Sequence, residues 1–256
     1  MPSYNTAKYI SNSIQSVLNQ TYTNWELIIV DDCSTDNTDE IVSQFEDQRI
    51  RYLKNPVRSG AAVSRNYALR EARGKWIAFL DSDDLWEPIK LERQLEFMKS
   101  NNYDFTYTDY QIIWDGTVRD KYVYTAPDFV DKKLIYRYCY FSTITVMYRR
   151  DVVGLIQIPP IKKNNDYAMW LKTIERANCY RLPECLSYYC KHQDSISGGS
   201  KWKLIKYHYL LFRMVVNYSP IYSVFCTLRN IWFGVNKKIK YKELADNYNK
   251  VRGKVE

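Results

Sequence analysis

The chain opens with an alternation of helix-like and strand-like hydrophobic patterns. Ile10, Ile14, Val17 and Leu18 are spaced at i, i+4, i+7 and i+8, which is typical of one face of a helix. The nearly continuous apolar run at 25–30, WELIIV, instead predicts a short buried strand. Further helices are predicted at 38–45, at 60–72 and from Pro88 onward, and further strands at 49–53 and 76–80. This alternation indicates βαβ units, so we expect an α/β fold with a mainly parallel central sheet flanked by helices.

The second half of the chain has a different pattern. It predicts short β segments at 105–124, strands at 142–148 and 186–189, and an amphipathic helix over 167–174. From residue 199 on, the chain is basic and aromatic, and we expect helices that lie outside the sheet. The predicted organisation is one domain over 1–198, with halves 1–104 and 105–198, followed by a basic helical extension over 199–256.

The net charge of +8 is concentrated near the end of the chain. From Ser195 to Lys242 there is no Asp or Glu, while nine Lys and Arg residues alternate with aromatic ones. The longest uncharged stretch there, 214–228, contains Pro220 and is shorter than the roughly 20 apolar residues of a spanning helix. We therefore expect a basic tail that binds the surface of an anionic membrane. The alternative is a helix pair packed on the main domain, with its lysines in solvent.

The cysteines and histidines do not form a metal-binding pattern. No Cys-x-x-Cys pair occurs among the six cysteines, and His192 and His208 do not complete a zinc site with Cys185 and Cys190. Scattered thiols in a chain of this length are typical of the reducing cytoplasm. The sequence also lacks the Gly-rich loops of P-loop and nicotinamide enzymes and the G-x-S-x-G elbow of hydrolases. Those enzyme classes are therefore not expected.

Two acidic clusters follow predicted strands. Asp31 and Asp32 come after the first strand, and Asp81-Ser82-Asp83 comes after the strand at 76–80. Ligands of open α/β sheets bind beyond the carboxyl ends of parallel strands, so the two clusters are expected at one site. Paired carboxylates suit Mg²⁺ or Mn²⁺, especially when a diphosphate supplies further oxygens. The alternative is that these acids are turn formers and helix caps.

At this point the sequence resembles the family 2 glycosyltransferases. The segment at 27–36, LIIVDDCSTD, resembles the nucleotide-binding loop of that family, and the opening MPSYN is similar to its P-x-Y-N motif. Gly60, the SRN at 64–66 and the GKWIAFLDSDD at 74–84 resemble its central signature. The resemblance covers about residues 1–190. It implies a GT-A fold, a nucleotide-sugar donor, a divalent metal and inversion at the transferred sugar.

The resemblance also implies roles for the residues near the nucleotide. Asp32, with Asp31 beside it, would accept the imide N–H of a uracil ring. Pro2, Ser3 and Tyr4 would line the nucleoside pocket.

A second set of roles concerns the donor diphosphate. Asp83, helped by Asp81, would hold Mn²⁺ or Mg²⁺ against it. Arg65 would either bind the nucleotide or brace the loops, and Asn66 would brace them. His192 would approach the metal or diphosphate, or else lie at the surface.

In this family the general base is the Asp of a Glu-Asp pair that opens a helix. The matching pair in this chain is Asn165-Asp166, so Asp166 is expected to take the proton of the acceptor hydroxyl. The alternative is a capping role, because an Asp in the first turn of a helix is favoured in any case. Trp170, one turn later, is expected in the core rather than as a platform for a sugar.

Family members have a strand directly before the P-x-Y-N motif, whereas this chain begins at Met1, at the motif itself. The loss of an interior strand would leave the backbone groups of its neighbours unpaired. We therefore expect several further apolar residues ahead of Met1 in the physiological protein.

Together these observations predict a metal-dependent inverting glycosyltransferase of bacterial surface polysaccharide assembly. Its donor would be a UDP-sugar and its acceptor a saccharide or lipid-linked saccharide at the cytoplasmic face of the membrane. A nucleotidyltransferase is the first alternative, but the basic Gly-rich loop that such enzymes carry is not seen in the sequence. A basic nucleic-acid-binding protein is the second, and the acidic clusters argue against it because they would repel phosphates. No nucleic acid is expected as a partner.

Overall fold

The computed structural model describes residues 1–114, 118–159, 161, 163–192 and 201–252. Its strands are β1 (Pro2–Ser3), β2 (Leu27–Asp31), β3 (Ile50–Lys54), β4 (Trp76–Ala78), β5 (Leu85–Trp86), β6 (Phe105–Trp114), β7 (Val118–Tyr124), β8 (Phe129–Val130), β9 (Val146–Arg149), β10 (Cys179–Lys191) and β11 (Lys242–Leu244). Its helices are α1 (Ile10–Leu18), α2 (Thr38–Ser43), α3 (Ala61–Glu71), α4 (Lys90–Asn101), α5 (Lys132–Ile135), α6 (Arg150–Val153), α7 (Asn165–Thr173), α8 (Lys201–Leu210), α9 (Pro220–Lys240) and α10 (Ala245–Arg252), with the turns η1 (Thr143–Thr145) and η3 (Leu211–Val215). The expected domain boundary at 198/199 lies outside the described residues.

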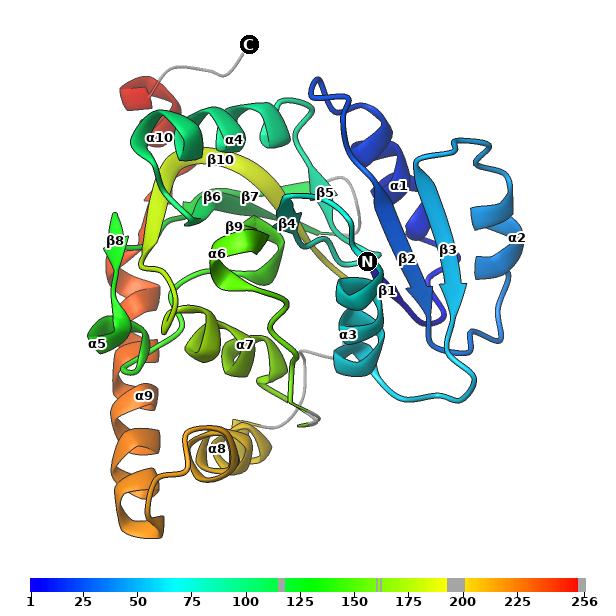
Figure 1. Cartoon of the computed structure of the whole chain (residues 1–256). Helices are drawn as coiled ribbons and strands as arrows, with labels where there is room; N and C mark the ends of the chain where they lie inside the picture. Colours follow the sequence, from blue (N-terminus) through cyan, green and yellow to red (C-terminus); the bar gives the residue numbers. More distant parts are fainter. Residues whose placement is uncertain (115–117, 160, 162, 193–200, 253–256) are drawn as a thin grey trace.

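The helices and strands predicted for the first hundred residues are confirmed. α1 buries Ile10, Ile14 and Val17, the face that the hydrophobic spacing predicted. All five residues of β2 are buried, as expected for a continuous apolar run. β1, β2 and β3 form a parallel three-stranded sheet in the order β1-β2-β3. This sheet lies at the right of Figure 1, beside the larger sheet.

The larger sheet is mixed, so the prediction of a mainly parallel central sheet was wrong. Its order is β11-β7-β6-β10-β5, with β4 on β9, β9 on β6 and β8 on β10. β10 pairs parallel to β6, while the other printed pairings of this sheet are antiparallel. β6 and β7 are separated by only three residues, 115–117, which is too short for the crossover that parallel neighbours require.

Helices cover both faces of the larger sheet. In Figure 1, α4 lies on one side of β6 and β10, and α6 and α7 lie on the other. Trp170 of α7 is fully buried and packs against Phe79, Phe105 and Phe141. The prediction that Trp170 is a core residue is confirmed.

The chain after residue 200 returns to the sheet. α8, η3 and α9 lie together at the lower left of Figure 1, and β11 then pairs antiparallel with β7. In α10, the Tyr248 hydroxyl donates a 2.7 Å hydrogen bond to Asp109 of β6. Asp109 also accepts two hydrogen bonds of 2.7 Å from Arg181. The expectation that this part of the chain lies wholly outside the sheet was therefore wrong.

None of the helices in the described part of the chain combines the length and the apolar character that crossing a bilayer requires.

Candidate active site

The opening residues and the loop after β2 are held side by side. β1 runs parallel to β2 with Ser3 opposite Asp31, and the Asp32 N–H donates to the Ser3 carbonyl at 2.8 Å. The Asp31 carboxylate accepts hydrogen bonds from the backbone N–H and the hydroxyl of Ser34, at 2.9 and 2.5 Å. Asn5 joins the two segments by accepting a 2.8 Å hydrogen bond from the Thr35 N–H. The sequence-predicted nucleotide loop is thus one hydrogen-bonded unit.

The Asp32 carboxylate organises a third loop. It is 3 % exposed and accepts hydrogen bonds from the Asn55 amide at 2.8 Å, the Ser59 N–H at 2.8 Å and the Gly60 N–H at 2.7 Å. Gly60 has a φ of 88°, a conformation that glycine adopts without strain, and it precedes α3. Three of about four acceptor sites of this carboxylate are therefore occupied by the protein itself.

Tyr4 lies beside the same loop and faces a cation. The Arg58 guanidinium lies over the Tyr4 ring, 4.0 Å from its centroid. Arg58 is exposed, and sequence reasoning did not single it out because an exposed Arg in a loop carries no local signal. A flat aromatic ring and a flat cation next to the Asp32 loop form a surface on which a nucleobase can stack.

The second acidic cluster is poor in hydrogen-bond donors. Asp84 is 1 % exposed; one carboxylate oxygen accepts from the Cys190 N–H at 2.7 Å, and the other finds no donor among the described residues. Burial, and then the charge of Asp81, raise the pKa of Asp83 to about 6. Burial and the charges of Asp83 and Asp81 raise the pKa of Asp84 well above its usual range. The sequence contained Asp84 next to the motif, but its burial came only with the structure.

Arg65 connects this cluster to the second half of the chain. Its side chain is 11 % exposed, and its guanidinium lies 2.5 Å from Asp81 and 3.4 Å from the Asn165 side-chain oxygen. Its Nε–H has no partner among the described residues. Asn66, one position on, bonds the backbone of Ile158 twice, at 2.6 and 2.8 Å, and so braces the loops as predicted.

The donor set at this cluster suits a divalent cation. No group of three or more His, Cys, Asp or Glu residues converges as a metal site within the described ranges. Mg²⁺, however, is commonly held by one or two carboxylates together with substrate phosphates. The unpartnered Asp84 oxygen and the raised pKa of Asp83 indicate negative charge that the protein leaves largely uncompensated. The carboxylate chemistry therefore fits a divalent metal, and the assignment of Asp83 and Asp81 as its holders stays a prediction.

Asp166 opens α7 and lies at the wall of a cavity. One carboxylate oxygen accepts the Tyr167 N–H at 2.8 Å, and the other lies 3.4 Å from the Thr143 hydroxyl. The cavity has a volume of about 320 Å³ and is lined by Tyr110, Tyr138, Cys139, Phe141, Ser142, Asn164, Asp166, Tyr167, Tyr189, His208, Asn230 and Lys237. The charge of Asp166 acts on Arg65, which places it within electrostatic range of the acidic cluster. One carboxylate oxygen of Asp166 is thus hydrogen-bonded within α7, whereas the other makes only the 3.4 Å contact with Thr143.

His192 lies against Tyr9, the residue that precedes α1. Its ring stacks on Tyr9 with centroids 3.7 Å apart and an interplanar angle of 17°. Its expected approach to a metal stays a prediction.

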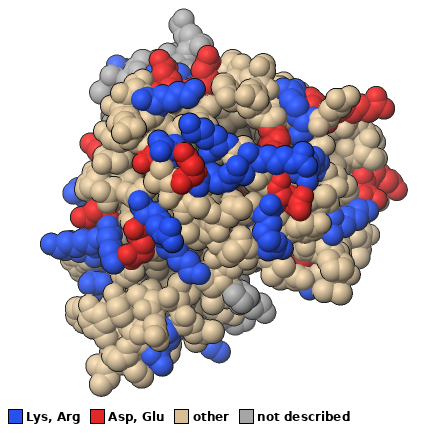
Figure 2. Space-filling model, in the orientation of Figure 1, with Lys and Arg blue, Asp and Glu red and all other residues tan. Residues whose placement is uncertain are grey.

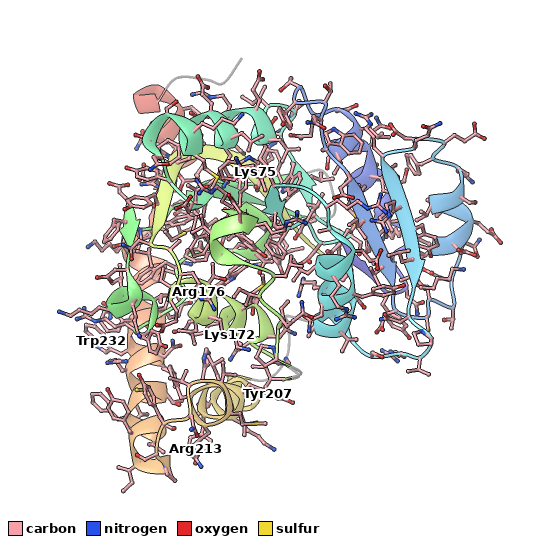
Figure 3. All side chains as sticks on the ribbon, viewed as in Figure 1. Lys75, Lys172, Arg176, Tyr207, Arg213 and Trp232 are labelled. Carbon is pink, nitrogen blue, oxygen red and sulfur yellow. The ribbon has the colours of Figure 1, made fainter. Side chains whose placement is uncertain are left out.

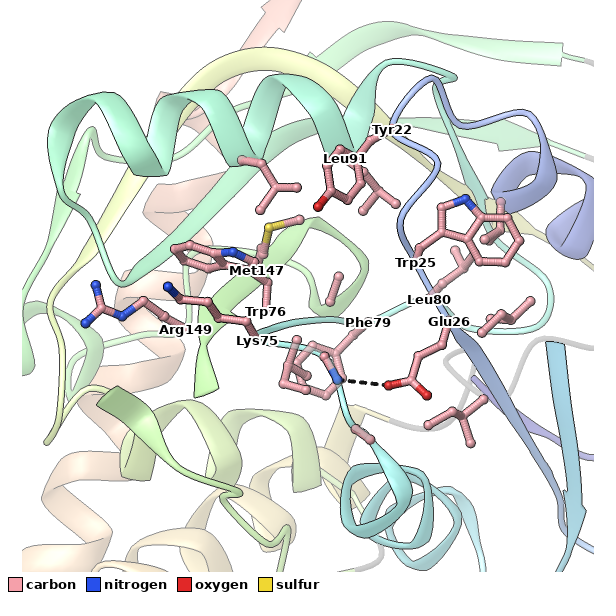
Figure 4. A pocket seen from close by; sticks show the side chains of 18 of the residues that line it. Tyr22, Trp25, Glu26, Lys75, Trp76, Phe79, Leu80, Leu91, Met147 and Arg149 are labelled. Carbon is pink, nitrogen blue, oxygen red and sulfur yellow. Dashed lines mark hydrogen bonds between the residues drawn. The ribbon is translucent and has the colours of Figure 1, made fainter. Parts of the chain in front are cut away.

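A larger cavity lies between the two sheets, as Figure 4 shows. It has a volume of about 870 Å³, and its wall is mainly apolar, with Leu80, Leu91 and Met147 among the residues drawn. Its carboxylate, Glu26, accepts hydrogen bonds from the Arg73 and Gly74 N–H groups at 2.6 and 2.9 Å. Pro2 lines this cavity, so its expected place in a nucleoside pocket stays a prediction. Five Lys and Arg residues also line it: Arg65, Arg73, Lys75, Lys99 and Arg149.

The sequence of this chain is similar to those of known glycosyltransferases. The family described as Glycosyl transferase family 2 matches residues 1–156. TuaG of Bacillus subtilis (strain 168), named for teichuronic acid biosynthesis, is 39 % identical over 93 % of this chain and 95 % of its own. WfgD of Escherichia coli is also 39 % identical, over 93 % of this chain and 92 % of its own. Its name describes a β-1,3-glucosyltransferase acting from UDP-Glc on α-D-GlcNAc-diphosphoundecaprenol.

Solved structures agree in fold. Staphylococcus aureus TarS 1–349, solved with UDP-GlcNAc, superimposes with a TM-score of 0.70 at 20 % identity, covering 99 % of this chain and 75 % of that one. The mannosyltransferase PcManGT of Pyrobaculum calidifontis, solved with GDP-Man and Mn²⁺, has a TM-score of 0.62 at 16 % identity, over 89 % and 67 % of the two chains.

Proposed function

This chain belongs to glycosyl transferase family 2, and on that premise we propose that it moves a sugar from a UDP-sugar to a lipid-linked saccharide, with inversion at the anomeric carbon. Its family and its relatives make it a nucleotide-sugar glycosyltransferase of polysaccharide biosynthesis. The name of WfgD supports the finer statement about donor and acceptor, and the UDP-GlcNAc complex of the TarS fold is consistent with it. The sugar itself is left to experiment.

The observation that carries the proposal is the position of Arg65. Its guanidinium contacts Asp81 on one side and Asn165 on the other, so that it joins the acidic cluster to α7, the helix that carries Asp166. A donor diphosphate at the cluster would therefore lie near an acceptor at the cavity. Arg65 is paired with Asp81, and the neutral Asn165 adds no second negative charge, so the guanidinium keeps positive charge for a phosphate.

The transfer we propose is a single displacement. Asp166 takes the proton of the acceptor hydroxyl, and the hydroxyl oxygen forms a bond to the anomeric carbon while the bond from that carbon to the UDP oxygen breaks. Mn²⁺ or Mg²⁺ held by Asp83 and Asp81 would supply positive charge for the leaving diphosphate. Arg65, next to both, would hold the diphosphate in line.

We assign the nucleoside to the unit formed by the opening loop and the Asp32 loop. Tyr4 and Arg58 offer stacking surfaces, and Ser3 and Asp31 hold the strand ends together. Asp32 retains about one acceptor site for an imide N–H.

The function is tested by a donor screen. Purified protein is incubated with UDP-sugars, Mn²⁺ or Mg²⁺ and a synthetic lipid-diphosphate-GlcNAc, and products are identified by mass spectrometry. We expect one glycosylated product together with UDP. Release of pyrophosphate would identify a nucleotidyltransferase instead, and no product from any UDP-sugar would contradict the proposed donor.

The base is tested by Asp166→Asn, which keeps the shape and capping ability of the side chain. We expect turnover to fall by about 10²–10⁴-fold while UDP affinity and melting temperature stay unchanged. Asp131→Asn is the matched control, because Asp131 caps α5 by accepting the Leu134 N–H at 2.7 Å and does not line the cavity beside Asp166. If both variants keep equal activity, Asp166 is a cap and not the base.

We also propose that α9 holds the protein against the inner face of the cell membrane. Large apolar side chains recur along one side of this helix with spacings of 4, 3, 4 and 3 residues, and they are 54–86 % exposed: Ile221, Phe225, Leu228, Trp232 and Val235. Figure 3 shows Trp232 on the outer side of α9, and the lower projection in Figure 2 is mostly tan. Such a stripe suits the interface of a bilayer.

The charge of this part of the chain favours anionic lipid as the occupant of the stripe. The chain from Ser195 to Lys242 contains nine cations and no anions, so anionic lipid complements it. A second copy would bring like charges together and offers no acidic partner for pairing. Trp232→Gln and Leu228→Gln should reduce sedimentation with phosphatidylglycerol vesicles, while Trp114→Gln, at a 46 % exposed tryptophan elsewhere, should not. Unchanged sedimentation, or a dimer in solution that Trp232→Gln dissolves, would overturn the proposal.

A further inference from the structure

The walls of the cavity beside Asp166 come from the middle of the chain and from the helices after residue 200. Phe141 and Tyr110 come from the main sheet region, whereas His208 comes from α8 and Lys237 from α9. Burial lowers the pKa of His208 to about 4, so its ring is neutral near pH 7, and its Nδ1 lies 3.2 Å from the Asn164 amide. The two charged groups of the lining are therefore Asp166 and Lys237.

The ammonium group of Lys237 has no ion-pair partner among the described residues. Its nearest aromatic contact is the Tyr138 ring, 5.5 Å from Nζ. The Lys237 side chain is half-buried at the cavity wall, and the lost hydration lowers the pKa of its ammonium group to about 8. A desolvated cation without a counter-ion gains most from an anion that enters the cavity.

The ammonium group is held near the base by a firmly seated helix. At Gly234, one turn before Lys237, an added Cβ would lie 2.8 Å from the Tyr138 ring, so the helix packs there at the closest approach. Two turns before Lys237, the Asn230 amide donates to the Arg137 carbonyl at 3.1 Å and contacts the Tyr167 hydroxyl at 3.2 Å. Cys139 lines the same cavity as Asp166 and Lys237, and the charges of both groups act on its thiol.

From this arrangement we infer that the cavity binds the saccharide acceptor and that Lys237 binds an anionic group of that acceptor, a phosphate or a carboxylate, beside Asp166. The inference rests on the proposed glycosyl transfer and adds a specificity-determining residue to it. The aromatic walls suit the apolar faces of a sugar ring, and the single cation selects acceptors that carry negative charge. The helices after residue 200 thus complete the acceptor site.

The inference is tested by comparing acceptors that share one sugar and differ in charge. A neutral alkyl glycoside, an alkyl diphosphate glycoside and an alkyl uronide are offered to the wild type and to Lys237→Met, which keeps the length of the stem. We expect KM for one of the anionic acceptors to rise roughly 10- to 100-fold. KM for the neutral acceptor, kcat and UDP affinity should not change. The acceptor that responds identifies the anion as phosphate or carboxylate.

Two further variants separate the charge of Lys237 from general effects of substitution in α9. Lys237→Arg retains the charge and should restore most of the affinity for the anionic acceptor. Lys240→Met is the matched control, since Lys240 is exposed one turn further along α9, with its Nζ 5.3 Å from the Tyr241 ring. An equal loss for neutral and anionic acceptors, or no loss for either anion, would overturn the inference. A wild-type protein without transfer from any UDP-sugar would instead contradict the proposed function.

Discussion

Asp31 and Asp32 end β2 among many hydrogen-bond donors, whereas Asp83 and Asp84, after β4, lie among other carboxylates with few donors. The Asp32 carboxylate alone accepts three hydrogen bonds from the segment 55–60. In the second cluster, the described residues leave one Asp84 oxygen without a donor, and the pKa of Asp83 is raised to about 6 by burial and by Asp81. Two acidic motifs that look alike in the sequence therefore meet opposite surroundings.

The difference separates two uses of a carboxylate. Backbone and amide donors stabilise the charge of Asp32, and in return that charge fixes the shape of the nucleotide loop. The charges of Asp83 and Asp84 are destabilising because burial and the neighbouring carboxylates oppose them. The surroundings of Asp31 and Asp32 are those of turn-forming acids. The surroundings of Asp83 and Asp84 are compatible with a divalent metal.

Asp83→Asn should have the largest effect on activity. Transfer should fall by about 10²–10³-fold, because charge on the leaving diphosphate loses its support. Stability without metal should stay equal or rise, since the substitution removes a buried like charge. Turnover and thermal melting with and without Mn²⁺ measure both effects. Asp151→Asn, at an exposed ion pair with Arg149, is the control, and full turnover of Asp83→Asn would refute the metal role.

Asp32→Ala should affect stability most. Loss of three charge-assisted hydrogen bonds, one of them from the buried Asn55, should lower the free energy of unfolding by about 2 kcal/mol. Urea denaturation measures this, and Asp39→Ala, at an exposed ion pair with Lys54, should change it by less than about 0.5 kcal/mol. UDP affinity should fall as well. An Asp32→Ala protein as stable as the wild type would erase the contrast between the clusters.

The cavity of Figure 4 lies between the strands that lead to the two clusters. Five apolar residues fused ahead of Met1 would extend β1 alongside β2 into this space and offer β4 a neighbour. We expect the melting temperature to rise by roughly 4–8 °C, because the insert buries apolar surface and pairs backbone groups. Five alternating Ser and Gly residues are the control. Equal melting temperatures for the two fusions would show that the slot does not accept a strand.

The smallest effect concerns pH. The folded pKa of Asp83, about 6, is above the ordinary value near 4, so folded protein binds this proton more tightly than unfolded protein. Its stabilising contribution is therefore present at low pH and is lost as the pH rises through about 6. Relative to Asp83→Asn, the wild type should gain roughly 2–4 °C in melting temperature between pH 7 and pH 5. A difference that is constant with pH would contradict the raised pKa.

Local patterns determined much of this protein. The spacing of Ile10, Ile14 and Val17 fixed the buried face of α1, and the apolar run before Asp31 fixed β2. Trp170 was placed in the core by its helical spacing, and the family was found from an ordered set of short motifs. These features depend on residues close in sequence, whose periodicity is set by the helix and the strand themselves.

The tertiary structure decided what depends on residues far apart. Whether strands pair parallel or antiparallel follows from which neighbours meet, so the mixed sheet and β11 were not readable from local pattern. The same holds for the acids: Asp32 accepts three hydrogen bonds from a loop 23–28 residues away, while one oxygen of the buried Asp84 finds no donor among the described residues. Lys237 reaches the wall of the Asp166 cavity only because α9 packs against Tyr138. The sequence supplies the charge of each of these groups, and the fold decides what compensates it, because hydration and partners change with burial.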